Sequence, residues 1–198
     1  MSIFSSVYGG NLLPFPEILR KMRRGPQVVL PKDIGMILAF TGVGKESVVV
    51  DAGAGSGFLA VSLGNVAKKV TSYERREDFA KLARDNVARA GLSNVEIKEQ
   101  DVFRGIAERG VDLVTLDLAD SHKAVGHAKK ALKKGGYVVG YLPHVEQVKK
   151  FVGACERNKF ENIFTLECIA RELLVRKEGT RPETKGLLHT GYLVFARK

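Results

Sequence analysis

Residues 47–57 read Ser-Val-Val-Val-Asp-Ala-Gly-Ala-Gly-Ser-Gly. The β-branched valines predict a short buried strand, and the glycines after them predict a tight turn that opens a helix over residues 57–66. In α/β folds, ligands bind where a strand passes through such a turn into a helix. The spacing is Gly-x-Gly-x-Gly, and the third glycine of a dinucleotide fingerprint would fall on Phe58. The acid beside the turn, Asp51, favours a positively charged ligand, such as a sulfonium with an amino-acid tail, over a phosphate.

Strands and helices alternate on both sides of this turn. A helix is predicted from Pro31, and a strongly amphipathic helix over residues 76–90 ends at Gly91. The other predicted segments are strands at residues 69–74, 95–99, 111–117 and 137–141, helices at residues 122–133 and 145–158, and extended runs at residues 163–170 and 191–196 that flank a polar loop at residues 176–186. This alternation is typical of an α/β fold with a Rossmann-like, mostly parallel, doubly wound sheet. Because no helix separates the last two runs, we expect them to form an antiparallel hairpin at one edge of the sheet.

Composition limits the class of protein. The 198 residues include 44% hydrophobic side chains, enough for the core of one domain. Lys and Arg (32) exceed Asp and Glu (22) by ten, which favours a polyanionic partner such as nucleic acid; a solvated cationic face gives the same count. Cys155 and Cys168 lie apart from any Cys or His cluster, so we expect neither a disulfide nor a metal site. Since no stretch resembles a membrane span or a signal peptide, we expect a cytoplasmic protein that does not contact membranes.

The first two dozen residues differ from the rest of the chain. Turn-forming Gly and Pro residues precede a basic run made by Arg20, Lys21, Arg23 and Arg24. We interpret residues 1–24 as a basic arm laid against a domain formed by residues 25–198. A solvated tail is the alternative interpretation.

Carboxylates follow three further predicted strands. Glu74 ends the strand after the glycine turn, at the place where an acid accepts both hydroxyls of an adenosine ribose. Asp101 follows the next strand, where a carboxylate can accept a proton of the adenine amino group. The glycine turn with these two acids predicts a site for S-adenosylmethionine (SAM). Asp117, at the end of the fourth strand, is a candidate general base or anchor for an acceptor amine; capping of the next helix is the alternative.

The chain resembles the tRNA (adenine-N1)-methyltransferase family, whose members modify the T-loop at position 58 and, in archaea, also 57. The matching stretches lie within residues 24–198 and are Arg24-Gly25-Pro26-Gln27-Val28-Val29, Pro31-Lys32-Asp33-Ile34-Gly35, Asp51 to Gly57, Ser72-Tyr73-Glu74, Arg76 to Ala80, Leu116-Asp117-Leu118, Arg181-Pro182, His189-Thr190-Gly191-Tyr192 and Phe195-Ala196-Arg197. The glycine turn is common to all class I methyltransferases. The segments around Gln27 and His189 are much more specific.

The resemblance implies a homotetramer that binds SAM and tRNA, with Asp117 as the catalytic carboxylate. The target base is buried in folded tRNA, so it would have to be flipped out into the pocket. The predicted cofactor-binding residues are Gln27, Asp51, Gly53, Gly55, Ser56, Gly57, Glu74, Asp101 and Val102. The predicted substrate or RNA contacts are Arg23, Arg24, Leu30, His144, Arg181 and His189. For Arg181 plain solubility, and for His189 a structural role, are the alternatives.

Three features depart from the family pattern. The β-rich N-terminal domain of the family is reduced here to about two dozen residues, Leu30 replaces an aromatic residue or histidine, and Ala119 replaces a proline. Two alternatives therefore stay open. One is a SAM-dependent methyltransferase that acts on another RNA base or on a small molecule such as a corrin precursor. The other is a non-catalytic RNA-binding subunit.

Overall fold

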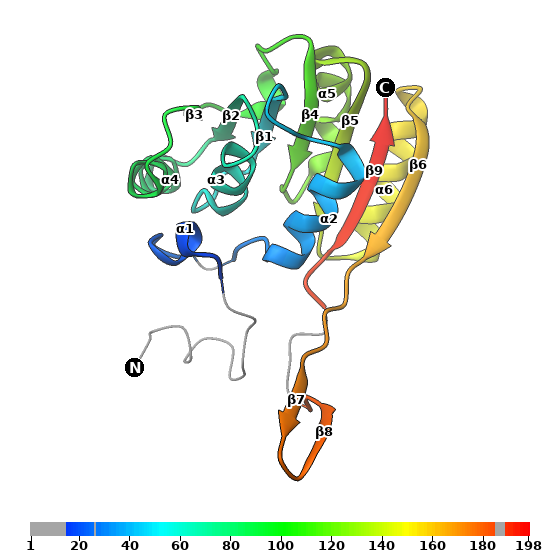
Figure 1. The fold of residues 1–198 in the computed structure, drawn as a ribbon. Coiled ribbons are helices and arrows are strands. Elements are labelled where there is room, and N and C mark those ends of the chain that lie inside the picture. Colours follow the sequence, from blue (N-terminus) through cyan, green and yellow to red (C-terminus); the bar gives the residue numbers. More distant parts are fainter. Residues whose placement is uncertain (1–14, 26, 185–188) are drawn as a thin grey trace.

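The computed structural model describes residues 15–25, 27–184 and 189–198, which form a central β-sheet with helices on both faces (Figure 1). The strands of this sheet are β1 (Val48–Ala52), β2 (Lys69–Glu74), β3 (Val95–Glu99), β4 (Val111–Leu116), β5 (Leu132–Leu142), β6 (Glu161–Glu167) and β9 (Tyr192–Arg197). The helices are α1 (Glu17–Arg20), α2 (Pro31–Thr41), α3 (Phe58–Gly64), α4 (Glu77–Ala90), α5 (Val125–Ala131) and α6 (Val145–Arg157), with 3₁₀ turns η2 (Val102–Arg104) and η3 (Ser121–Lys123).

The seven strands lie in the order β3-β2-β1-β4-β5-β9-β6. The first five run parallel, and β9 is inserted antiparallel between β5 and β6. The strand order reverses direction between β1 and β4, and ligands of doubly wound folds bind outside the carboxyl ends of the strands at such a point. The predicted fold class is confirmed, including the antiparallel pair at one edge.

The sheet is covered on both faces because its central strands are buried on both. Val49 packs with α2 and α3 on one face, whereas its neighbour Val50 packs with α5 and α6 on the other. Figure 1 shows these two helical layers in front of and behind the sheet. Near-continuous apolar runs such as Val48 to Val50 are the sequence pattern of strands buried in this way.

The described part of the N-terminal segment lies against the domain. Phe15, Leu19 and Met22 are buried in an apolar cluster with Phe58 of α3 and Val87 of α4. The guanidinium of Arg24 lies 5.2 Å from the centre of the Phe15 ring. Residues 1–14 of the predicted arm lie outside the described residues.

Several boundaries predicted from the sequence are wrong: the strand predicted at residues 137–141 begins at Leu132, and the run predicted at residues 163–170 ends at Glu167. The helix predicted to end at residue 133 ends at Ala131, because Leu132 already pairs with Val111 of β4 and its side chain is buried. The predicted polar loop at residues 176–186 contains a strand. There, β7 (Leu173–Arg176) and β8 (Gly179–Pro182) form a separate hairpin that projects from the body (Figure 1). Among the described residues, no helix is both long and apolar enough to cross a bilayer.

Candidate cofactor and substrate site

The glycine turn brings the ends of β1 and β4 together. Gly53 has a φ of 90°, and a Cβ built on it would lie 2.1 Å from the backbone carbonyl oxygen of Asp117. The Asp117 amide donates to the carbonyl of Ala52 at 2.9 Å. Gly57, with a φ of 81°, then starts α3. A side chain at Gly53 is excluded both by its φ and by this close approach, so the turn requires glycine there.

Asp51 lies beneath the turn and is almost completely buried. Ser72 and Thr115 each donate a hydroxyl hydrogen bond of 2.6 Å to its carboxylate, one from β2 and one from β4. Burial raises the pKa of Asp51, and the two hydroxyls oppose that rise. Both carboxylate oxygens thus have protein donors. Asp51 fixes the strand ends and places negative charge under the site.

The Glu74 side chain is fixed at the end of β2. One carboxylate oxygen accepts the amide of Gly55 at 3.0 Å, and the other accepts the amide of Arg76 at 3.0 Å. The Arg76 guanidinium lies 4.0 Å from the same carboxylate. These contacts tie Glu74 to the glycine turn and hold its carboxylate in one orientation.

A pocket of ≈ 110 Å³ opens at the ends of β1, β2 and β3. Its lining residues are Gly53, Tyr73, Glu74, Arg75, Gln100, Asp101, Val102, Phe103, Leu118, Ala119 and Asp120. Asp101 accepts the amide of Phe103 at 3.0 Å and so begins η2. Four predicted cofactor residues, Gly53, Glu74, Asp101 and Val102, therefore line a single pocket.

Asp117 is half-buried beside two other carboxylates. Burial, with the negative charges of Asp51 and Glu74, raises the pKa of Asp117 to about 7. Within the part of the chain that the structure describes, no side chain donates a hydrogen bond to its carboxylate. A cationic or hydrogen-bond-donating ligand would satisfy this carboxylate and lower its pKa.

Asn86, which is completely buried in α4, is a residue of this region that the sequence does not predict. Its amide donates to the carbonyls of Arg23 at 2.7 Å and Ser56 at 2.8 Å, and its oxygen accepts the Arg23 amide at 2.8 Å. Asn86 therefore joins the N-terminal segment to the glycine turn. The available signal was a polar residue on the apolar face of an amphipathic helix.

Residues 12–183 match the family described as the tRNA methyltransferase complex GCD14 subunit. The chain belongs to this family. A tRNA (adenine(57)-N(1)/adenine(58)-N(1))-methyltransferase from Methanocaldococcus jannaschii is 40% identical over 91% of this chain and 75% of that protein.

Two solved structures resemble this member of the GCD14 family closely. The tRNA (m1A58) methyltransferase of Aquifex aeolicus has a TM-score of 0.86 at 31% identity, and the match covers 92% of this chain and 76% of that chain. A SAM-dependent O-methyltransferase of Thermotoga maritima has a TM-score of 0.87 at 33% identity, covering 92% and 71%. Family and fold together make this chain a methyltransferase of the tRNA-modifying type.

Three other predicted site residues of this GCD14 family member do not line the cofactor pocket. Gln27 is exposed, whereas Leu30 is 8% exposed and belongs to the apolar cluster around Phe58. Leu30 therefore contributes to the core in this structure, and little of its side chain is left for a base. Arg181 is exposed on β8, in the projecting hairpin.

The two predicted histidines lie at the carboxyl edge of the sheet. His144 precedes α6, and Gln147 accepts its amide at 3.2 Å while donating to Ala119 at 3.0 Å. His189 Nδ1 lies 2.6 Å from Glu167, and Nε2 lies 2.9 Å from the carbonyl of Pro143. The hydrogen bond with Glu167 raises the pKa of His189. With both ring nitrogens facing protein acceptors, His189 joins the ends of β5 and β6.

Proposed function

We propose that this protein transfers a methyl group from SAM to N1 of an adenine in the T-loop of tRNA, at position 58 or 57. One observation carries the proposal: Glu74 ends β2, Asp101 follows β3 and Asp117 follows β4, so these acids lie at the carboxyl edge of the sheet beside the glycine turn that follows β1. The similarity to the named tRNA adenine-N1 methyltransferases supports adenine as the acceptor base in this proposal.

The residues of the pocket fit SAM. Glu74 would accept the ribose hydroxyls, Asp101 would accept the adenine amino group, and the Gly53–Gly57 turn leaves room for close approach of the ligand. Asp51 and Asp117 add negative charge that suits a sulfonium. When bound, SAM supplies a methyl group on a cationic sulfur.

Asp117 is the residue that would orient the acceptor. Adenine N1 is a weak nucleophile, so holding it in line with the methyl group supplies much of the rate. An ionised Asp117 can accept a hydrogen bond from the adenine N6 amino group. The product base carries a positive charge, and a nearby carboxylate stabilises that charge as it develops. The half-buried position of Asp117 strengthens this interaction, since less water screens it.

The test is methyl transfer to an unmodified tRNA transcript, followed by mass spectrometry of the nucleosides. N1-methyladenosine from the natural protein, reduced by at least about 100-fold in Asp117→Ala, is the expected result. Asp85→Ala is the matched control, because it removes the same side chain from an exposed position of α4 that lines neither pocket. A different methylated nucleoside, or equal activity in Asp117→Ala, would overturn the proposal or the role of Asp117, respectively.

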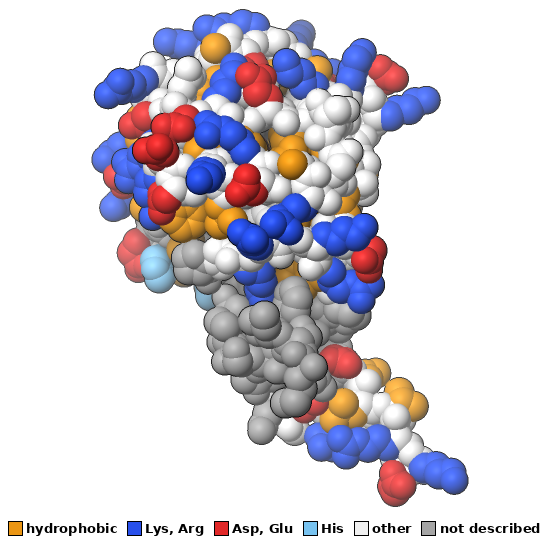
Figure 2. Space-filling view, turned by 90° about the vertical axis from the view of Figure 1, so that its left-hand side faces the viewer, with side chains coloured by type: hydrophobic (Ala, Val, Ile, Leu, Met, Phe, Trp, Pro, Cys, Tyr) orange, Lys and Arg blue, Asp and Glu red, His pale blue; other side chains and the backbone are white. Residues whose placement is uncertain are grey.

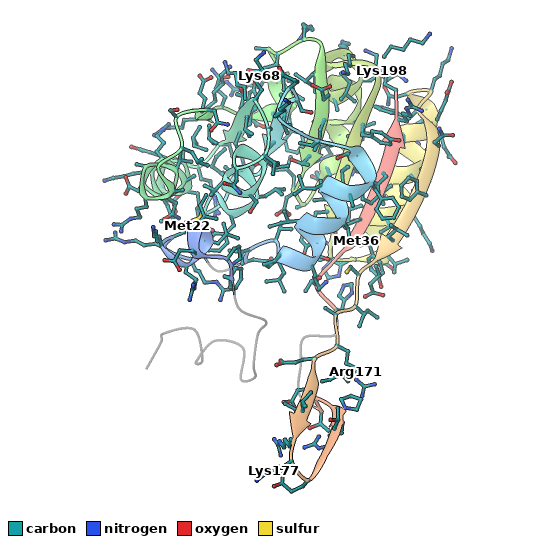
Figure 3. All side chains as sticks on the ribbon, viewed as in Figure 1. Met22, Met36, Lys68, Arg171, Lys177 and Lys198 are labelled. Atoms are coloured by element: carbon teal, nitrogen blue, oxygen red, sulfur yellow. The ribbon has the colours of Figure 1, made fainter. Side chains whose placement is uncertain are left out.

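We also infer that the protein is a homo-oligomer whose contacts include the β7–β8 hairpin. Leu173 and Val175 are 56% and 79% exposed, and they share one face with Pro182, the cross-strand partner of Leu173. Figure 2 shows hydrophobic side chains among the charged ones on this projection, and in Figure 3 Lys177 marks its tip and Arg171 its base. An isolated two-stranded hairpin is only marginally stable in water, so a covering surface is needed.

The resemblance to the family favours a tetramer, and the mass of the assembly tests this. Multi-angle light scattering should give about four times the chain mass of 21.7 kDa. Val175→Glu should shift the protein to a smaller species because it charges the apolar face of the hairpin. Glu178→Lys, a change at the turn of the same hairpin, should leave the mass unchanged. A monomeric natural protein would refute this inference.

A further inference from the structure

A second and larger groove lies beside the proposed cofactor pocket. Its volume is ≈ 820 Å³, and it shares Arg75, Gln100 and Asp101 with that pocket. Its lining residues are Arg75, Glu99, Gln100, Asp101, Arg104, Gly105, Ile106, Ala107 and Arg109. SAM is the proposed ligand of the smaller pocket. That proposal does not say what kind of ligand the larger groove binds.

The acidic and basic side chains of the groove differ in whether they have hydrogen-bond or ion-pair partners. Arg84 donates to Glu99 at 3.1 Å, whereas Asp101 accepts the backbone amide of Phe103 with one oxygen and has the other left for the ligand of the smaller pocket. By contrast, the guanidinium groups of Arg75 and Arg104 are exposed and have no hydrogen-bond or ion-pair partner among the described residues. The groove therefore offers unpaired positive charge at the rim of the pocket.

One wall of the groove is held in a fixed shape from below. The Tyr73 hydroxyl accepts the amide of Ala107 at 3.1 Å and donates to Glu108 at 2.5 Å. Lys98 donates to the other oxygen of Glu108 at 2.5 Å, and this contact lowers the pKa of Glu108 against the effect of burial. Arg109 closes the same turn by donating to the backbone carbonyls of the three residues before it. A groove with such a wall requires little ordering when a ligand binds.

We propose that this groove binds the phosphodiester backbone of the RNA substrate through Arg75 and Arg104. The inference rests on the proposed function, because a base flipped into the active site brings its flanking phosphates to the surface around it. Guanidinium groups bind phosphate oxygens in bidentate pairs, and the two that lack partners here line one groove. Figure 2, which faces the β3 and α4 side, shows Lys and Arg side chains spread among acids there rather than one uniform basic patch. RNA contact on this side therefore depends on particular arginines.

Arg104→Gln gives the clearest test, because Arg104 lines the groove but not the smaller pocket. The dissociation constant of unmodified tRNA should rise by roughly 3- to 10-fold, and the slope of log K against log salt should fall by about one. The dissociation constant of SAM should stay within about twofold of the natural value. Arg75→Gln combined with Arg104→Gln should weaken tRNA binding further.

The matched control is Arg89→Gln, which removes the same charge from an exposed position in the last turn of α4. It should leave tRNA affinity and the salt slope unchanged. Equal tRNA affinity in Arg104→Gln and the control, or a loss of SAM affinity in place of tRNA affinity, would overturn the inference. Because binding is measured without turnover, this result is independent of the proposed reaction. Weaker tRNA binding by Arg104→Gln, together with no N1-methyladenosine from the natural protein, would refute the proposed reaction. It would still support the proposal that the groove binds tRNA.

Discussion

The Thr190 hydroxyl donates a 2.8 Å hydrogen bond to the carboxylate of Asp33, 157 residues away in the chain. Lys32 donates to the other Asp33 oxygen at 2.8 Å, to Thr190 at 2.7 Å and to the carbonyl of Cys168 at 2.6 Å. Asp33 is completely buried, so this network supplies the partners that its charge requires. It fastens the first turn of α2 to the two segments from which the β7–β8 hairpin projects. The Pro-Lys-Asp and His-Thr-Gly stretches thus meet for a structural reason.

Thr190→Val should destabilise the protein by about 1–3 kcal/mol, because the buried Asp33 loses a donor and nothing replaces it. Urea unfolding followed by circular dichroism measures the change. Thr180→Val, at an exposed position of β8, is the control for loss of a hydroxyl and should change stability little. Equal stability of the two variants would show that the Thr190 hydroxyl contributes nothing to the stability of the protein through Asp33.

Gly53→Ala should remove SAM binding and lower stability by roughly 2–4 kcal/mol. The added methyl group would lie 2.1 Å from the Asp117 carbonyl at a φ of 90°, so the ends of β1 and β4 must separate. Calorimetric titration with SAM and thermal unfolding measure the two effects. Gly42→Ala has a similar positive φ but no atom within 4 Å, so it should cost only about 1–2 kcal/mol of backbone strain. Normal SAM affinity in Gly53→Ala would contradict the role given to the turn.

The sequence alone predicts the parallel part of the sheet, because short stretches of sequence are enough to mark each of its strands. Apolar runs mark strands buried on both faces, and the carboxyl ends of parallel strands meet at one edge. That geometry is why the sequence alone predicts that Gly53, Glu74 and Asp101 lie together. The close approach of Gly53 to Asp117 follows from the same arrangement.

Contacts between distant segments could not be predicted in this way. The sequence around Asn86 does not indicate that this residue joins Arg23 to Ser56. Likewise, the sequence around Thr190 does not indicate that its hydroxyl donates a hydrogen bond to Asp33. The β7–β8 hairpin was missed because its four-residue strands are short and one of them consists of Gly, Thr, Arg and Pro. The family pattern alone predicts that Leu30 contacts the substrate, whereas in the structure Leu30 packs in one apolar cluster with residues of the N-terminal segment.

Asp117→Asn should stabilise the ligand-free protein above pH 7. The pKa of Asp117 is about 7 in the folded protein and 3.8 when the chain is unfolded. The contribution of this carboxyl group to the free energy of unfolding therefore falls as pH rises from about 4 to about 7. The full shift would correspond to about 4 kcal/mol, and partial solvent exposure reduces the expected gain to about 1–2 kcal/mol. The difference between variant and natural protein should therefore be absent at pH 4, grow to pH 7 and then stay constant. Asp120→Asn should show no such gain, because Lys123 lowers the pKa of Asp120.

The pH dependence of kcat/KM should carry the same pKa. In its proposed role Asp117 must be ionised to accept the N6 amino hydrogen bond, so kcat/KM should fall about tenfold per pH unit below about pH 7. A bound sulfonium favours the carboxylate, so the profile of kcat should turn down at lower pH than that of kcat/KM. Asp117→Asn should retain low activity with a flat profile over this range. A natural enzyme whose kcat/KM is constant between pH 5.5 and pH 8 would show that the reaction does not require ionised Asp117. The predicted effect of Asp117 on stability would still stand.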